Sequence, residues 1–334
     1  MRFRLVVLIA VFCAFVLAAC GSASQEKVVK KIGEQWTESK GYELNATMEM
    51  KTGGEPRTYD INVWHTKPDF YRVTVTQQDE NVTQMIVRNK DGVFVVTPAL
   101  RKTYKFQSEW PKQNSQAYLI GALADDITAD AKAVMTENDK NYVFDVATRN
   151  ADKTGLPSQK VTIDKKSLLP KSVVIMNDAL EEQIVISFKN IDFSKAHKEE
   201  EYAVEKFSES KEDDVAGADI ENKEFQTHYP VVQFENTKLT GEQAIQGDGM
   251  ERVVLTYEGD KAFTLMQQPA SKSDSLVPVF APGDPADLGF TIGAITDSSI
   301  SWERDGISYF IASTKLTREE MMEVAASVTE GSMK

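Results

Sequence analysis

The chain has 334 residues, of which 51 are acidic and 38 are basic, and its formal net charge at pH 7 is −13. A body this acidic repels the phosphates of DNA and RNA, which excludes nucleic acid as a main partner. The chain has only two cysteines, Cys13 and Cys20, and its length is ample for one or two hydrophobic cores.

The first twenty residues have the layout of a bacterial secretory signal. A basic start with Arg2 and Arg4 precedes fifteen residues without charge, Leu5 to Ala19. The Leu-Ala-Ala-Cys at positions 17–20 matches the lipobox of bacterial lipoproteins, in which a diacylglycerol alkylates the cysteine thiol before the signal is removed. We therefore predict that residues 1–19 are a signal peptide and that Cys20 is the lipidated first residue of the mature chain.

Two alternatives stay open for this segment: an uncleaved transmembrane anchor, and a soluble secreted protein in which Cys20 is incidental. Fifteen helical residues at about 1.5 Å each fall short of the roughly 30 Å of hydrocarbon in a bilayer. Two or three acyl chains, at about 0.8 kcal/mol for each buried CH₂, anchor a protein stably. The favoured interpretation places the protein on the extracytoplasmic side of the cell membrane, held by the lipid on Cys20.

The mature chain keeps 36 basic and 51 acidic residues, because the signal carries two arginines and no acid. This charge argues against a flat contact with an anionic membrane, which needs basic clusters. Cys13 leaves with the signal, so no disulfide can form within one mature chain. Residues 20–25 are predicted to form a short flexible tether.

A helix is predicted after the tether, from about Glu26 to Ser39, because Val28, Ile32 and Trp36 recur at helical spacing. From position 42 the apolar period changes to two. Strands are predicted near 42–50, 59–63, 71–76, 82–88, 93–97 and 104–106. The pattern indicates an antiparallel meander with one buried face.

Large aromatic side chains are frequent on these strands. They indicate either a large core or a concave sheet that holds an apolar cavity. The candidate lining residues are Trp64, Phe70, Phe94, Tyr104 and Phe106. An apolar ligand would bind there chiefly through buried area, at about 25 cal/mol for each Å².

A second helix is predicted from Pro111 to about Asp126, and it would lie across the open face of the curved sheet. Further strands near 142–147, 159–163, 171–176 and 184–188 complete this first unit. The stretch from His197 to Asp219 is rich in charge and is predicted to be a solvated linker or helix face, and residues 206–224 are predicted to be the linker between the two units.

Residues 225–334 are predicted to form a smaller α+β domain. Its strands are expected near 229–233, 239–246, 251–258, 262–268, 290–295, 299–304 and 307–312, with a Pro/Gly loop around 278–285. Thr317 and Glu320 have the spacing of a capping box and predict a final helix.

Four segments of the first unit carry a resemblance to a known family: 63–72, 89–98 with its Asn-Lys-Asp-Gly turn, 163–170 and 185–190. Residues 26–205 resemble the LolA/LolB-type lipoprotein-carrier superfamily. Within it they are most similar to the branch of sporulating Gram-positive bacteria that contains the YdcC-type sporulation lipoproteins and the GerS-type germination lipoproteins. The resemblance implies an α+β fold, an unclosed antiparallel β-barrel (half-barrel) with a helical lid over an apolar cavity.

The same resemblance implies binding of acyl chains or of a partner protein, not catalysis. Carriers of the LolA kind are soluble shuttles, whereas this chain is expected to stay lipidated. The germination-linked relatives suggest instead a non-enzymatic partner of a cell-wall enzyme. The second unit, through 302–309 and 317–326, resembles a small extracytoplasmic domain of other envelope proteins of such bacteria.

Motifs for catalysis are missing from the sequence: it has no G-x-S-x-G, Walker loop, H-E-x-x-H, EF-hand loop or C-x-x-C. The three histidines, His65, His197 and His228, are far apart, and His65 is expected at the surface. We expect no cofactor, no metal and no enzyme activity. Two hypotheses remain, a lipid-binding lipoprotein linked to sporulation and a docking scaffold for a cell-wall enzyme of spore formation or germination.

Overall fold

The computed structural model describes residues 24–51, 56–78, 82–108, 110, 116–148, 156–208, 225–247, 250–273, 277–288, 291–304 and 306–330. The predicted signal peptide, Cys20 and most of the linker 206–224 lie outside these ranges and stay predictions. In the described part, no helix is both long enough and apolar enough to cross a membrane.

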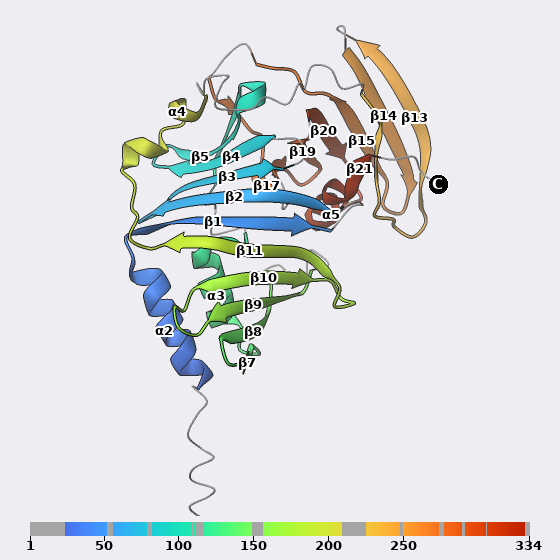
Figure 1. Cartoon of the computed structure of the whole chain (residues 1–334). Helices are drawn as coiled ribbons and strands as arrows, with labels where there is room; N and C mark the ends of the chain where they lie inside the picture. Colours follow the sequence, from blue (N-terminus) through green and yellow to red (C-terminus); the bar gives the residue numbers. More distant parts are fainter. Residues whose placement is uncertain are drawn as a thin grey trace, which may run out of the picture.

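Twelve described strands form the first sheet, and its order follows the chain closely (Figure 1). The strands are β1 (Gly41–Met50), β2 (Arg57–Thr66), β3 (Phe70–Gln77), β4 (Thr83–Asn89), β5 (Gly92–Thr97), β6 (Lys102–Phe106), β7 (Val134–Glu137), β8 (Asn141–Ala147), β9 (Ser158–Asp164), β10 (Pro170–Met176), β11 (Glu182–Asp192) and β16 (Val279–Phe280). Their order is β16-β6-β5-β4-β3-β2-β1-β11-β10-β9-β8-β7. Every neighbouring pair is antiparallel except β16 with β6, which is parallel.

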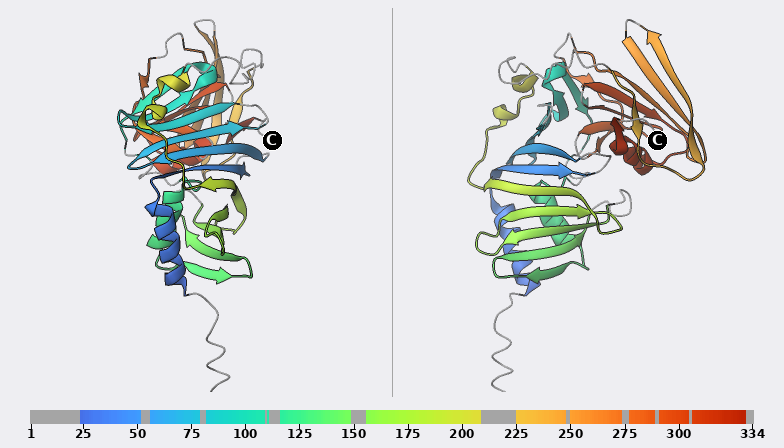
Figure 2. Two further views of the ribbon diagram at one scale, coloured as in Figure 1. Left: turned by 60° about the vertical axis from the view of Figure 1, so that its left-hand side comes forward. Right: turned by 45° about the vertical axis from the view of Figure 1, so that its right-hand side comes forward.

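The sheet is open, because its edge strands β16 and β7 are not paired with one another in the described ranges. Two helices, α2 (Gln25–Glu38) and α3 (Ile120–Ala129), lie together on one side of its lower half (Figure 2). The predicted fold class, an α+β unclosed antiparallel half-barrel with a helical lid, is therefore confirmed.

Helix α2 begins within one residue of the predicted start and buries one apolar stripe. Val28, Ile32 and Trp36 are buried at helical spacing, and the indole of Trp36 donates to the carbonyl of Leu168 at 2.9 Å. The amide of Gln25 also binds the backbone of β7 and the turn before it. The first helix is thus fixed to the sheet at both ends.

Helix α3 differs from its prediction. It was expected from Pro111 to Asp126, but it begins at Ile120 and ends at Ala129, and residues 111–115 lie outside the described part. Leu119 has an extended backbone, with φ −87° and ψ 120°, so the helix cannot start earlier. Tyr118 and Leu119 are buried in the turn before the helix, which explains why their apolar pattern looked helical.

The second sheet has seven described strands in the order β13-β14-β15-β20-β19-β18-β17. They are β13 (Thr237–Gly247), β14 (Met250–Gly259), β15 (Phe263–Pro269), β17 (Asp284–Asp287), β18 (Ile292–Ile295), β19 (Ser299–Arg304) and β20 (Ile307–Ala312). A two-stranded sheet joins β12 (His228–Pro230) to β21 (Val328–Glu330). The start of α2 and the β13–β14 hairpin lie at opposite ends of the molecule (Figure 1).

The final helix, α5 (Arg318–Ser327), confirms the predicted capping box. The hydroxyl of Thr317 accepts from the amide of Glu320, whose carboxylate accepts from the amide of Thr317. Met321, Val324 and Ala325 form its buried face. The helix therefore covers the second sheet as its apolar spacing indicated.

Four short strands were missed: β7, β16, β17 and β21. Of these, β16 and β17 lie in the predicted Pro/Gly loop, which is therefore not wholly irregular. Sequence alternation cannot identify a two-residue strand, because two residues contain no period. The consequence is structural, since β16 belongs to the second unit by sequence but extends the first sheet by pairing with β6.

Candidate functional site at the seam between the two sheets

The predicted lining residues divide between the two faces of the first sheet. Trp64, Phe70 and Phe94 lie on the outer face, in an apolar cluster with the buried Tyr202 and Val204. Tyr104 and Phe106 lie on the inner face, packed with the main core. Because β-strand side chains alternate between faces, the five residues do not line one cavity, and the single predicted site is corrected accordingly.

The outer-face cluster is covered by residues 196–208, which we call the strap. It contains the short helices η2 (Glu199–Tyr202) and α4 (Glu205–Ser208). Tyr202 is fully buried, and its hydroxyl and that of Thr66 are 2.9 Å apart. The strap therefore occupies the outer face of β2–β5, where the sequence suggested only a solvated charge run.

Trp64 joins the strap to the sheet. The imidazole of His197, in the strap, stacks on its ring with centroids 3.7 Å apart. The guanidinium of Arg72 lies 3.3 Å from the same ring centroid, and since two groups this close cannot share one side, the indole is sandwiched between them. Both faces of the Trp64 ring are therefore occupied by side chains of the protein itself, so the ring does not line an open cavity.

The inner face is filled at the end that α3 covers. Trp110 is fully buried there and packs edge-on against Tyr71, and His65 stacks on Tyr71 with centroids 4.2 Å apart. Burial lowers the pKa of His65 and raises that of Tyr71. His65 is therefore a neutral, partly buried residue, not the surface residue that was expected.

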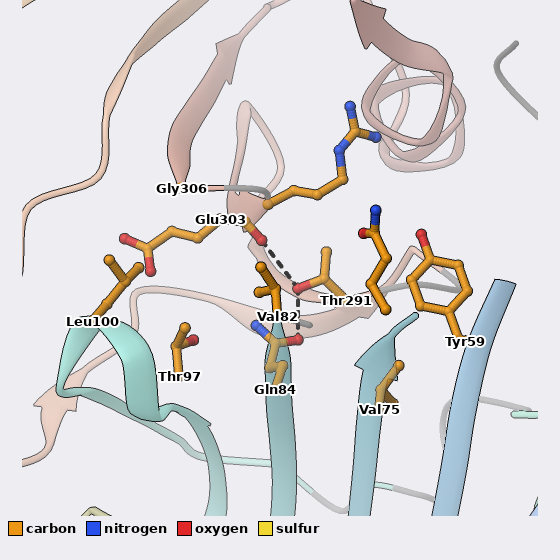
Figure 3. A pocket seen from close by; sticks show the side chains of 11 residues that line it. Tyr59, Val75, Val82, Gln84, Thr97, Leu100, Thr291, Glu303 and Gly306 are labelled. Carbon is orange, nitrogen blue, oxygen red and sulfur yellow. Dashed lines mark hydrogen bonds between the residues drawn. The ribbon is translucent and has the colours of Figure 1, made fainter. Parts of the chain in front are cut away.

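A cavity of about 40 Å³ lies at the other end of the inner face, in the seam between the two sheets (Figure 3). Its volume is enough for a few water molecules but is far below the roughly 300 Å³ of a small-molecule site. The residues that line it are Tyr59, Val75, Gln77, Val82, Gln84, Thr97, Leu100, Thr291, Glu303, Arg304 and Gly306. Figure 3 shows that both units contribute to this lining.

The carboxylate of Glu303, in β19, accepts hydrogen bonds from three polar side chains at the seam. Its Oε1 accepts from Nζ of Lys102 at 2.5 Å, from the hydroxyl of Tyr104 at 3.2 Å and from that of Ser308 at 3.0 Å. The side chains of Glu303 and Lys102 are only 11% and 18% exposed. Burial, and then Glu303, raise the pKa of Tyr104, so its phenol stays protonated and donates.

A second contact crosses the seam beside the cavity. The hydroxyl of Thr291 donates to Oε1 of Gln84 at 2.6 Å, and the amide of Ile292 donates to the same atom at 3.3 Å. The hydroxyl of Thr97 is buried with no hydrogen-bond partner among the described residues. A bridging water in the cavity would satisfy it.

The seam joins the two units but has no catalytic arrangement among the described residues. Lys102, Tyr104 and Ser308 all donate to one carboxylate, so none of them is an activated nucleophile. No group of three or more acidic, histidine or cysteine side chains in the described part could hold a metal. The carboxylate of Asp126, in α3, is buried and accepts from the side-chain amide of Gln159 at 2.8 Å.

Sequence reasoning missed Glu303 and Lys102 as a pair. Lys102 alternates with Tyr104 and Phe106 on the inner face of β6, and a lysine at an inward position signals a buried partner. The partner is 201 positions away in the sequence and could not be assigned. The ring nitrogen Nδ1 of His228, in the second unit, lies 2.6 Å from the hydroxyl of Tyr309.

Comparison with known proteins places the chain in a family. Residues 2–202 match the family described as "Sporulation protein YdcC-like". The sporulation protein YdcC of Bacillus subtilis (strain 168) is 36% identical over 319 residues, which cover 96% of this chain and 94% of that protein.

Similar solved structures are distant. The Pseudomonas aeruginosa MucA/MucB complex covers 93% of this chain and all of the matched one, at 14% identity and a TM-score of 0.33. The match to a LolA superfamily protein of Nitrosomonas europaea covers 55% of this chain and 98% of that protein, at 9% identity and a TM-score of 0.31. The match to the structure of the CwlD amidase of Clostridioides difficile in complex with the GerS lipoprotein covers 53% of this chain and 98% of the matched one, at 12% identity and a TM-score of 0.24. TM-scores this low do not bear on function, but the sequence matches do, and they show that the chain belongs to the YdcC-like family of sporulation proteins.

Proposed function

We propose that the protein is a lipid-anchored, non-enzymatic docking protein of the cell envelope that acts in spore formation. Membership of the YdcC-like family supports the link to sporulation. The lipobox ending at Cys20 supports anchoring at the extracytoplasmic face of the cell membrane. The locked hydroxyl and amine groups of the seam support a role in binding over one in catalysis.

The filled inner face is the observation that favours docking over lipid carriage. Trp110, Ile120 and Leu123 are each fully buried against the inner face at one end, and the second unit covers the other end. An acyl chain would have to displace these side chains, whereas a partner protein can use surfaces that are already exposed.

The test is made on the protein solubilised gently from the membrane of sporulating cells. Intact mass should show a diacyl adduct on Cys20, and solvent extraction should release no further lipid. Cross-linking in sporulating cells should then recover one dominant protein partner. Absence of the adduct would refute the anchor, and absence of any partner would refute docking.

A second candidate function, binding of an acyl ligand after the lid moves, has one observation in its favour. The indole N–H of Trp110 and the side-chain oxygen of Gln116 are buried without a hydrogen-bond partner in the described part. Both flank the start of the lid, so its closed state leaves polar groups unsatisfied, which lowers the cost of opening. Stoichiometric lipid in the solvent extract would favour this function over docking.

A further inference from the structure

An apolar run lies exposed at one edge of the first sheet. The side chains of Val277, Val279 and Phe280 are 71%, 58% and 57% exposed, and the run carries no charge. Monomeric proteins expose single apolar residues often, but contiguous exposed apolar runs mark binding sites. Because the run includes the edge strand β16, its backbone is also available for pairing.

The backbone of β16 presents one free pairing position. The amide of Ala281 donates to the carbonyl of Lys105 at 2.9 Å, so Ala281 faces β6. Backbone groups of neighbouring strand residues point to opposite sides, and the N–H and C=O of Phe280 therefore point away from β6. Phe280 has no hydrogen-bond partner in the part of the chain that the structure describes.

The opposite edge of the same sheet is covered by the chain itself. At β7 the side chain of Gln25 donates to the carbonyl of Ala133 at 2.9 Å and accepts from the amide of Met135 at 3.1 Å. One glutamine amide thus takes the place of a neighbouring strand. Such cover is a common protection of a sheet edge, and the described residues provide none for the backbone of Phe280 in β16.

The edges of the second sheet are protected in other ways. The register of β13 shifts between Leu239 and Gly241, a bulge that twists an edge away from pairing. At β17, Asp284 pairs with Arg318 at 2.6 Å, and the next residue is Pro285, which has no N–H to offer. Among the described edges of the two large sheets, β16 is the one where several exposed apolar side chains adjoin a backbone position that faces away from its sheet, whereas β13 has a single exposed apolar side chain, Ile245.

The described charged residues that precede and form β6, the neighbour of β16, are basic. The described residues of η1 (Pro98–Leu100), β6 and β16, with Arg101 between the first two, contain Arg101, Lys102 and Lys105 and no acid. Lys102 is paired with Glu303, which leaves Arg101 and Lys105 beside the exposed run, and Lys105 lies opposite Phe280 in the register. In a chain of net charge −13, this margin is locally basic.

We propose that the free edge of β16, with Val277, Val279 and Phe280, docks an extended segment of a partner protein that has apolar side chains and acidic flanks. The segment would pair with the backbone of Phe280 as an added strand, its apolar side chains would cover the exposed run, and its acids would face Arg101 and Lys105. This inference rests on the proposed docking function and assigns it a surface.

The experiment begins with a photo-reactive phenylalanine analogue placed at position 280 of the full chain in sporulating cells. The matched control carries it at position 180, where Leu180 is 71% exposed on the turn between β10 and β11. We expect one discrete adduct from position 280 and none from position 180. Mass spectrometry of the adduct identifies the partner segment, which we expect to be extended, apolar and flanked by acids.

The partner is then purified and its affinity for full-chain variants is measured. Phe280→Ser should weaken binding about thirtyfold, as for a central aromatic anchor. Lys105→Glu should weaken it mainly through slower association at low salt. Leu180→Ser should leave affinity unchanged, and all variants should keep the thermal unfolding midpoint of the wild type because the replaced side chains are exposed or at an edge.

The outcomes separate this surface from the docking function as a whole. A partner that binds Phe280→Ser as tightly as wild type overturns the β16 assignment and leaves the docking function intact. Equal adducts from positions 280 and 180 overturn the assignment as well. Absence of any partner in the general cross-linking described above overturns the docking function itself.

Discussion

Glu303, which accepts hydrogen bonds from Lys102, Tyr104 and Ser308, is the hub of the seam, and removing its carboxylate alone should destabilise the protein strongly. Glu303→Ala removes the acceptor of three donors and leaves the ammonium of Lys102 unpaired at only 18% exposure. Removing one partner of a buried ion pair costs about 3–5 kcal/mol, and the residual exposure of Lys102 favours the lower end. We expect the free energy of unfolding to fall by about 3 kcal/mol.

The double variant makes this prediction specific to the pair. Lys102→Met alone should cost about 2 kcal/mol, because Tyr104 and Ser308 still solvate the carboxylate. Lys102→Met with Glu303→Ala should cost about 2 kcal/mol as well, because no unpaired charge remains. The two changes are therefore expected to be strongly non-additive.

Urea unfolding of the full chain, followed by circular dichroism, measures these free energies. Lys171→Met is the control, because its pair with Asp164 is 2.9 Å long but lies at the surface, where solvent screens it, so its loss should change stability little. Additive costs in the double variant, or a cost of Glu303→Ala no larger than that of the control, would refute the role of the hub.

Three further variants test the lid, the buried histidine and the terminal helix. Trp110→Ala should lower the unfolding free energy by about 4 kcal/mol, because a fully buried indole is replaced by a cavity, and an unchanged thermal midpoint would contradict the filled inner face. Burial holds the pKa of His65 below its ordinary value near 6.5, so the unfolded chain takes up the proton first and stability falls as pH drops below about 6.5. His65→Phe should reduce that loss in a pH series of unfolding curves, and identical pH profiles would count against it. Thr317→Ala should cost about 1 kcal/mol by removing the cap of α5, and a Ser replacement should restore most of it.

Local pattern predicted the elements of this chain well, because their periods are local properties. The spacing of Val28, Ile32 and Trp36 located α2, and alternation located the long strands β1 to β3. The Asp91-Gly92 turn was predicted between β4 and β5, and Gly92 there has φ 137°, a conformation that other residues rarely adopt.

The division of the aromatic residues between faces could not be predicted from the same pattern. Residues Val93 to Val96 of β5 are all buried, because both of its faces are covered, so the strand is apolar throughout and has no polar face to set its orientation. Phe94 could then be assigned to either face. In the structure Phe94 lies on the outer face, where Tyr202 of the strap packs against the same cluster. The strap itself could not be predicted to cover this face, because its sequence is rich in charge and resembles a linker.

Closure of both faces restricts how this protein can bind a partner. The lid and the second unit cover the inner face, and the strap covers the outer face of β2–β5, so apolar recognition there requires a segment to be displaced first. An edge needs no such displacement, since its backbone groups and side chains are already exposed. Anchoring through Cys20 would hold the start of α2 near the membrane and leave the β13–β14 end of the molecule farther out (Figure 1). A partner that reaches the β16 edge would then be held at a fixed place on a protein that cannot diffuse away from the membrane, which is how a non-enzymatic lipoprotein can localise an envelope enzyme during spore formation.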